Sequence, residues 1–379
     1  MKKETLNIYV HIPFCVKKCP YCSFTSFSPG DVPEKEYTEC ILGELSYLLK
    51  RENLKCPVET VYFGGGTPSI FSPDSIKRIM EGIGKKLPLL KGVSEVTLEV
   101  NPDTVDKKKL LGFKNAGINR LSIGVQSFNE GELKKLERTH SAGKGELAFL
   151  DARDSGFKNI GIDLIFAIPG QTLPGFERSL SKTIKLRPEH VSIYALTVEE
   201  GTPYSRAFKK GGLRFPPEKI CVDMYLGAIG LLKENGYTHY EISNLALPGF
   251  ESRHNTACWL GKNYLGLGAG AHSYMRYPGW GRRWWNRPYF PHYMEALDKK
   301  GSHVLGKETL KEDSAKLEAI FLGLRLLKGI GKNEFKKRFG SPPEAFLQWE
   351  RLTELGLVKD KGDRISLTEK GILFSNEVF

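Results

Sequence analysis

The chain has 379 residues, of which 40% are hydrophobic and 26% are charged. This composition is ordinary for a folded globular protein and excludes wholesale disorder, while the length predicts one large domain and a smaller one. The formal net charge of +12 comes in short lysine and arginine pairs or triplets, which are typical of a solvated surface and identify no partner. Because no apolar run reaches the roughly 18 residues of a membrane span and no signal-peptide pattern is seen, we expect a cytoplasmic protein without a membrane span.

The first half of the chain alternates β-rich runs with amphipathic segments, several of which begin on proline, serine, threonine or aspartate, as helices do. This alternation predicts right-handed crossovers on a parallel sheet. Six such strands fit a partial or full barrel or an open doubly wound sheet, and periodicity does not choose between them. The expected strands are Asn7–His11, Thr60–Phe63, Glu95–Val100, Arg120–Val125, Asn159–Phe166 and His190–Ala195. The expected helices are Pro33–Arg51, Pro73–Lys86, Thr104–Ala116, Gly143–Ser155 and Pro174–Lys185.

The second half is less regular. A helix at Glu218–Asn235 and a strand at Thr238–Ile242 extend the first unit, whereas Leu247–Pro291 is rich in glycine and aromatic residues. We expect this segment to be irregular and functional. From about Leu310 onward, the sequence pattern predicts helices followed by a short hairpin. This arrangement resembles a winged-helix module. Its expected elements are the helices Asp313–Leu327, Lys332–Arg338 and Pro343–Leu355 and the strands Val358–Lys361 and Arg364–Leu367. The expected domains are residues 1–245, 246–309 and 310–379.

Three of the seven cysteines fall within eight residues, at Cys15, Cys19 and Cys22, while the others stand alone. An odd, clustered set favours metal or redox ligands over a disulfide framework. The spacing Cys-x3-Cys-x2-Cys directly after the first strand suits an iron–sulfur cluster held by one loop, with one iron left open for another ligand. The alternative is a zinc site that includes His11, although this spacing is not a common zinc pattern.

Further polar and glycine residues follow the other strands. The run Gly64-Gly65-Gly66-Thr67-Pro68 comes after the second strand, where glycines let the backbone approach a ligand closely. Polar side chains at strand ends are typical of sites in barrels and open sheets, although structural salt bridges remain an alternative for them. These residues are Glu99, Gln126 and Asp163, together with Arg138 farther along the chain.

The cysteine motif, with the glycine run after the second strand, resembles the radical S-adenosylmethionine (SAM) superfamily. More narrowly, Tyr9-Val-His-Ile-Pro-Phe-Cys15 is similar to the oxygen-independent coproporphyrinogen III oxidase-like family. The resemblance implies an α/β fold with a partial (β/α)6 barrel, a [4Fe-4S] cluster on Cys15, Cys19 and Cys22, and bound SAM. By the family pattern, the residues that would bind SAM are Tyr9, Tyr21, Gly65, Gly66, Thr67, Glu99, Gln126, Arg138, Asp163 and Ala195.

Three features resemble the haem-chaperone branch of this family. Two of them are departures from the family's coproporphyrinogen III dehydrogenase, which has an additional cysteine two positions after the third cluster cysteine, where this chain has Phe24, and a longer segment before its first strand. In addition, His254-Asn-Thr-Ala-Cys258-Trp259 resembles the HNxxYW signature, whose histidine is implicated in haem binding. Cys258 replaces the tyrosine of that signature. A hydrogen-bonded structural histidine is the alternative for His254.

The resemblance therefore implies a chaperone that binds haem and transfers it to acceptor proteins, with membrane respiratory enzymes as candidate acceptors. The alternative is an enzyme that cleaves SAM to a 5′-deoxyadenosyl radical, as in coproporphyrinogen III oxidation. The absence of the extra cysteine favours the chaperone, so we expect no coproporphyrinogen III conversion. A DNA-binding redox regulator is a third hypothesis, but it rests only on the basic charge and the C-terminal module, so no nucleic-acid partner is expected.

Overall fold

The computed structural model describes residues 4–89, 94–299, 302–346 and 348–378. The strands of its large sheet are β1 (Leu6–Ile12), β2 (Val58–Gly65), β3 (Glu95–Val100), β4 (Arg120–Gln126), β5 (Ile160–Phe166), β6 (His190–Ala195), β7 (Thr238–Glu241), β8 (Asn244–Ala246), β9 (Tyr264–Leu267), β10 (His272–Met275), β11 (Arg282–Asn286) and β12 (Val304–Thr309). Their order across the sheet is β12-β11-β10-β9-β1-β2-β3-β4-β5-β6-β8-β7.

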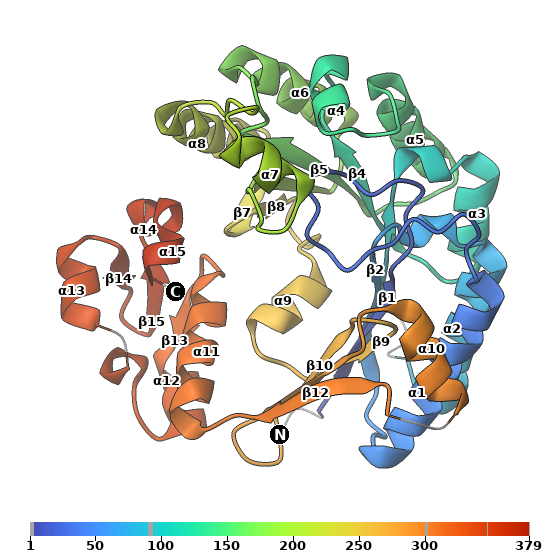
Figure 1. The fold of residues 1–379 in the computed structure, drawn as a ribbon. Helices are drawn as coiled ribbons and strands as arrows, with labels where there is room; N and C mark the ends of the chain where they lie inside the picture. The colour runs from blue at the N-terminus through green and yellow to red at the C-terminus, as the bar shows by residue number, and fades with distance from the viewer. Residues whose placement is uncertain (1–3, 90–93, 300–301, 347, 379) are drawn as a thin grey trace.

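Strands β1 to β6 form the parallel centre of this sheet. Most helices lie along its outer, convex side, and the sheet curves without closing on itself (Figure 1). The partial barrel is thereby confirmed. Beyond the parallel centre, β9 pairs with β1 on one side and β8 pairs with β6 on the other. The helices of this part are α1 (Glu34–Arg51), α2 (Pro73–Lys86), α3 (Lys107–Asn115), α4 (Glu130–Lys135), α5 (Ala142–Asp154), α6 (Leu173–Leu186), α7 (Pro203–Lys209), α8 (Glu218–Glu234), α9 (Arg253–Trp259) and α10 (Phe290–Asp298), with 3-10 turns at Pro68–Ile70 and Pro102–Thr104.

The strand–helix units form where the sequence predicts them because their local signals agree with their packing. Helix α2 begins after Ser72, whose side chain accepts a hydrogen bond from the Ser75 N–H, and Pro73 takes the first helical position. Its apolar face, with Ile76 and Ile79, is buried against the sheet core. Strand β1 is buried along almost its whole length, as expected for a central parallel strand.

The expectation that residues 247–291 are irregular is wrong. This segment contains α9 and strands β9, β10 and β11, and β9 pairs in parallel with β1 at Asn7–Val10. Positive φ angles at Gly268 and Gly270 allow the tight reversal between β9 and β10. The strands are only four or five residues long, too short for a clear alternation, and their pairing partner lies far away in the sequence.

The C-terminal part packs around its own hydrophobic core, which it shares with Tyr274 of β10. Its elements are α11 (Glu312–Leu324), β13 (Ile330–Gly331), α12 (Lys332–Phe339), α13 (Trp349–Glu354), β14 (Val358–Asp360), β15 (Arg364–Leu367), α14 (Glu369–Leu373) and α15 (Ser375–Val378). The strands form a small sheet in the order β13-β15-β14. The domain boundaries at residues 245 and 309 stay a prediction.

The single helix expected at Pro343–Leu355 is wrong. The structure has a 3-10 turn at Pro343–Ala345, and α13 begins at Trp349. The Phe346 N–H donates to the Pro343 carbonyl, which is the hydrogen bond of a 3-10 turn, and the Phe346 ring lies 6.4 Å from that of Phe335. The expected helix is therefore interrupted at the point where the Phe346 ring packs near Phe335. Among the described residues, no helix is long and apolar enough to cross a membrane.

Candidate functional site

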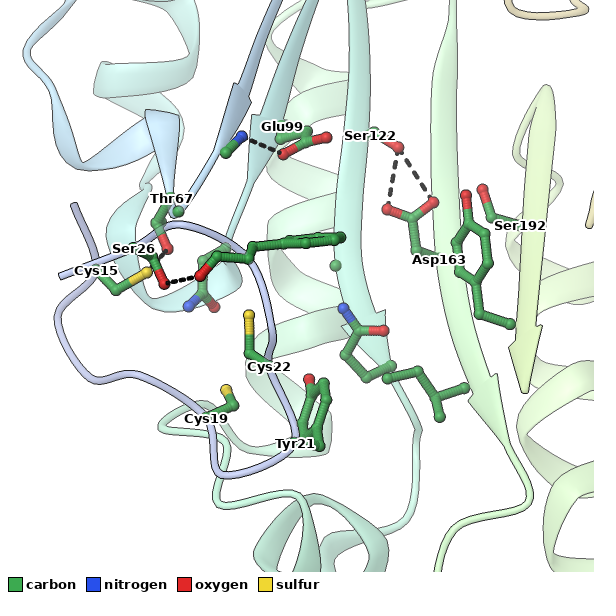
Figure 2. Close-up of a pocket in the computed structure, with 18 of the residues that line it drawn as sticks. Cys15, Cys19, Tyr21, Cys22, Ser26, Thr67, Glu99, Ser122, Asp163 and Ser192 are labelled. Carbon is green, nitrogen blue, oxygen red and sulfur yellow. Dashed lines mark hydrogen bonds between the residues drawn. The ribbon is translucent and has the colours of Figure 1, made fainter. Parts of the chain in front are cut away.

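A cavity of about 430 Å³ lies at the carboxyl ends of the parallel strands. The loop after β1 carries Cys15, Cys19 and Cys22 to one side of it, and Glu99 and Asp163 lie deeper, on the strands (Figure 2). Backbone hydrogen bonds close this loop, from Cys15 N–H to the Phe27 carbonyl and from Phe27 N–H to the Pro13 carbonyl. The three cysteines predicted as cluster ligands are thus brought together at one wall of the cavity.

Hydrogen-bond donors face two of these thiols. Thr67 Oγ1 donates to Cys15 Sγ at 3.5 Å, and Arg138 Nη1 donates to Cys19 Sγ at 3.6 Å. Burial raises the pKa of Cys15 and Cys22. Donors aimed at the sulfurs stabilise thiolates once a metal is bound, so the donor set fits an iron–sulfur cluster.

The zinc alternative needs His11 as a fourth ligand, and both ring nitrogens of His11 are engaged. Nδ1 lies 3.0 Å from the Tyr9 hydroxyl and Nε2 lies 2.8 Å from the Thr25 carbonyl. No three His, Cys, Asp or Glu side chains of the described residues are grouped as ligands of one metal ion. Cluster thiolates bind different irons, so they need no such convergence. The engaged histidine therefore disfavours the zinc site.

The glycine run packs directly against the cysteine loop. Gly65 has φ +119°, and a Cβ there would lie 2.6 Å from the His11 ring. At Gly66 a Cβ would lie 2.7 Å from the Phe14 carbonyl oxygen and 3.0 Å from Cys15 Sγ. Only glycine fits between these two loops without displacing backbone atoms. The run therefore lets the second strand approach the cysteines closely.

Two buried carboxyl groups lie on neighbouring sides of the cavity. Glu99 accepts hydrogen bonds from the Tyr62 hydroxyl at 2.8 Å and from Gly65 N–H at 3.3 Å, and burial raises its pKa to about 7. Asp163 accepts a hydrogen bond from Ser122 Oγ, and burial raises the pKa of this carboxyl too. Such perturbed acids in a cavity are typical of ligand-binding sites.

Nearly all the residues predicted to bind SAM line this cavity. The exception is Tyr9, whose hydroxyl is bonded to His11 and whose ring stacks on Tyr62. The lining members are Tyr21, Gly65, Gly66, Thr67, Glu99, Gln126, Arg138, Asp163 and Ala195. An arginine suits a carboxylate, and acids and amides suit an amino group or ribose hydroxyls. The cavity can therefore hold a zwitterionic nucleoside next to the thiols.

His254 lies on α9 behind the cavity wall, while its neighbour Asn255 lines the cavity. Only 4% of His254 is exposed, and its ring centroid lies 4.9 Å from that of Tyr62. Burial and the nearby Arg120 lower its pKa to about 3, so the imidazole is neutral. The side chain is held by packing and hydrogen bonds, as in the structural alternative, and its role in haem binding stays a prediction.

Several cavity residues were missed by sequence reasoning. Arg120 and His190, the first residues of β4 and β6, line the deep end together with Ser192 and Tyr194. Arg120 is 1% exposed, and nearby Glu95 helps to keep it charged. The sequence did contain a signal for Arg120, namely a charged side chain at the start of an apolar strand. Burying a charge costs free energy unless it is paired or bound to a ligand, so such a residue indicates a functional or paired position.

Comparison with known families agrees with this geometry. A model of the Radical SAM superfamily matches residues 9–183, and one of the HemN C-terminal domain matches residues 310–374. The solved structure of coproporphyrinogen III oxidase (HemN) from Escherichia coli, described as a radical SAM enzyme, has a TM-score of 0.84 at 22% identity, covering 99% of this chain and 89% of that chain. The fold and the site thus define a radical SAM protein.

Relatives with known names identify the family within the radical SAM proteins. The heme chaperone HemW of Bacillus subtilis (strain 168) is 35% identical over 98% of each chain. HemW of Lactococcus lactis (strain IL1403) is 35% identical over 100% of this chain and 97% of its own length, and that of Escherichia coli (strain K12) is 32% identical over 100% and 98%. The chain belongs to the HemW family.

Proposed function

We propose that this protein is a haem chaperone of the cytoplasm, which binds haem and transfers it to acceptor proteins. The observation that carries this proposal is the similarity to curated heme chaperones, which extends over the whole chain at up to 35% identity. Phe24 supports it, because this residue is 67% exposed beside the cysteine loop and occupies the position of the dehydrogenase's additional cysteine.

The cavity is the proposed site of the [4Fe-4S] cluster and SAM. Cys15, Cys19 and Cys22 would hold the cluster, which supplies an iron with an open coordination position and redox capacity. Arg138 would orient the SAM carboxylate by a charge-assisted hydrogen bond, and Glu99 would bind the amino group. The close contact of the glycine run with the cysteine loop leaves no room for a larger side chain between them.

The proposed haem ligand is His254, whose neutral imidazole can bind iron. Cys258 lies one helical turn away on α9, and burial raises the pKa of its thiol to about 12. A protonated thiol is a poor ligand, so the histidine is favoured over the cysteine. The double variant His254→Ala with Cys258→Ala removes both candidates and should lower haem affinity.

The test uses the full chain, reconstituted anaerobically with iron and sulfide. We expect it to bind hemin and to transfer it to a haem-depleted acceptor, such as a membrane respiratory enzyme, without converting coproporphyrinogen III. SAM turnover is followed separately as 5′-deoxyadenosine. Robust decarboxylation of coproporphyrinogen III with SAM turnover would overturn the chaperone proposal in favour of the radical enzyme. Hemin binding without transfer to any acceptor would reduce the role to haem storage.

A further inference from the structure

The ammonium group of Lys109, on α3, joins two of the loops that line the cavity. Its Nζ donates to the backbone carbonyls of Ser69 at 2.6 Å, Thr104 at 3.0 Å and Ile70 at 3.4 Å. Ser69 and Ile70 belong to the loop after β2, whereas Thr104 belongs to the loop after β3. An ammonium carries three hydrogens, so three carbonyls from two loops use all of its donors.

The surroundings of this ammonium favour a fixed contact. It lies 5.7 Å from the centroid of the Phe113 ring, and both Phe113 and Ser69 are fully buried. No ion pair between the described residues involves Lys109, so backbone carbonyls are its direct partners. Hydrogen bonds donated by a charged group are stronger than neutral ones. The ammonium therefore holds the two loops more firmly than a neutral side chain would.

The same two loops also meet through hydroxyl groups, and each donor there is determined. Thr104 Oγ1 donates to the Asn101 carbonyl at 2.9 Å. A hydroxyl has one hydrogen, so Ser69 Oγ is the donor in the 2.6 Å contact between the two hydroxyls. Ser69 Oγ in turn accepts the Asn101 N–H at 3.0 Å. The loops therefore meet through a polar contact to which Lys109 contributes the charge.

This contact lies next to the residues proposed to bind SAM. Thr67 and Asn101 line the cavity from the two loops, and Glu99 lines it from near the end of β3. Glu99 also accepts the Gly65 N–H at 3.3 Å, so β3 and the glycine run share a hydrogen bond at the cavity wall. The separation of the two loops therefore affects how far Glu99 lies from the glycine run.

We propose that Lys109 is a positioning residue of the SAM site, whose ammonium fixes the separation of the loops after β2 and β3 and thereby the distance between the glycine run and Glu99. Lys109 is not among the residues that line the cavity, so it acts through the loops and not by contact with SAM. The role in SAM binding rests on the proposed function, whereas the tie between the loops does not.

The tie is measured without cluster or SAM, by hydrogen exchange of the full chain followed by mass spectrometry. Lys109→Met removes the ammonium and keeps an unbranched side chain, so the amides of residues 66–71 and 101–104 should exchange faster. Lys108→Met is the matched control, because Lys108 is the exposed neighbour on the same helix and its loss changes the net charge equally. Unchanged exchange in Lys109→Met, or equally faster exchange in Lys108→Met, would overturn the proposal.

A measurement on the wild type covers the case in which Lys109→Met does not fold. An ammonium held by three carbonyls exchanges its hydrogens slowly with water, and NMR of the full chain labelled with 15N-lysine detects such a group. The Lys109 signal is assigned by its loss in Lys109→Arg. We expect a protected ammonium, and rapid exchange of this signal in the folded wild type would overturn the tie.

SAM calorimetry of the cluster-loaded chain tests the consequence for the site. Loss of a charge-assisted hydrogen bond typically costs about tenfold in affinity, so Lys109→Met should bind SAM more weakly by that factor, with the iron content of the wild type. Lys108→Met should bind SAM as the wild type does. In Lys109→Ala, propylammonium chloride should restore affinity, because it supplies the missing chain and its N–H donors, whereas tetramethylammonium chloride, which has no N–H, should not.

The outcomes separate positioning from other effects. Restoration by both salts would assign the loss to charge alone and overturn the proposal. Wild-type SAM affinity in Lys109→Met, together with faster exchange of the loops, would show a tie without a role in SAM binding and would overturn it as well. Failure of the wild type to bind SAM would overturn the proposed SAM site and the role of Lys109 there, while the exchange result for the loops would still stand.

Discussion

At the scale of single residues, Gly66 decides how closely the second strand can approach the cysteine loop. Gly66→Ala would place a methyl group 2.7 Å from a backbone oxygen, which cannot rotate away as a side chain can. We expect incomplete iron–sulfur loading and a lower melting temperature. Gly43→Ala is the control, because a Cβ at this exposed helical position meets nothing within 4 Å and should stabilise by about 0.5–1 kcal/mol. Wild-type cluster content in Gly66→Ala would contradict the prediction.

The three clustered cysteines give a direct test of the cluster site. Changing Cys15, Cys19 and Cys22 together to alanine should abolish the broad iron–sulfur absorption after anaerobic reconstitution, because thiolates are its ligands. Variants of Cys40, Cys56 and Cys221 should keep that absorption. Stoichiometric zinc in anaerobically purified wild-type protein, with neither iron nor sulfide, would mean that the motif binds another metal.

Glu99 predicts a pH dependence of SAM binding. Its pKa is raised to about 7, so the free protein holds this carboxyl protonated at lower pH, and an ammonium ligand must displace the proton. SAM affinity should therefore fall below pH 7, by at most about 1.4 kcal/mol per pH unit, and level off above it. Calorimetry of Glu99→Gln should give weaker binding without this slope. The same slope in the variant would assign the titration to another group.

The raised pKa of Glu99 also makes the stability of the folded protein depend on pH. The folded state holds the proton more tightly than the unfolded state, whose glutamate has the usual pKa near 4.5. This contribution is therefore fully present below about pH 4.5 and is lost as the pH rises through about 7. Burial of Glu99 thus works against stability at neutral pH, as is common for residues kept for a ligand.

At the scale of elements, α9 depends on Glu95. The carboxylate of this β3 residue accepts the backbone N–H groups of Arg253 at 3.0 Å and His254 at 3.1 Å. Glu95→Gln would turn an amide donor toward one of these donors, so we expect a loss of about 1.5–3 kcal/mol in the free energy of unfolding, measured by urea denaturation. Glu59→Gln breaks a partly exposed ion pair with Lys262 and should cost less than about 1 kcal/mol. Equal costs would argue against a special role of Glu95.

At the scale of the whole molecule, the C-terminal part covers the edge of the large sheet. Ile242 N–H donates to the Arg325 carbonyl, and Leu327 N–H donates to the Tyr240 carbonyl. Arg283 of β11 also pairs with Glu318 of α11 at 2.8 Å. These contacts make the C-terminal part a structural support of the sheet.

Removing residues 310–379 should therefore lower the melting temperature of the remaining chain, because Tyr274 would lose the apolar core that now buries it. The measurement is thermal unfolding of the truncated and full chains at equal concentration. An unchanged melting temperature would show that the remaining chain does not depend on the C-terminal part for its stability.

The sequence by itself determined the parallel strand–helix units, the clustered cysteine ligands and the strand-end polar residues. These features are encoded locally, since helix caps, strand alternation and ligand spacing need only neighbouring residues. Only the tertiary structure decided that β9 pairs with β1, where Asn7 and Asn263 meet across 256 positions, and that His254 lies behind Tyr62. Arg120 and His190 likewise became cavity residues only in three dimensions. Such contacts depend on packing between distant segments, and short, weakly periodic segments do not specify their partners locally.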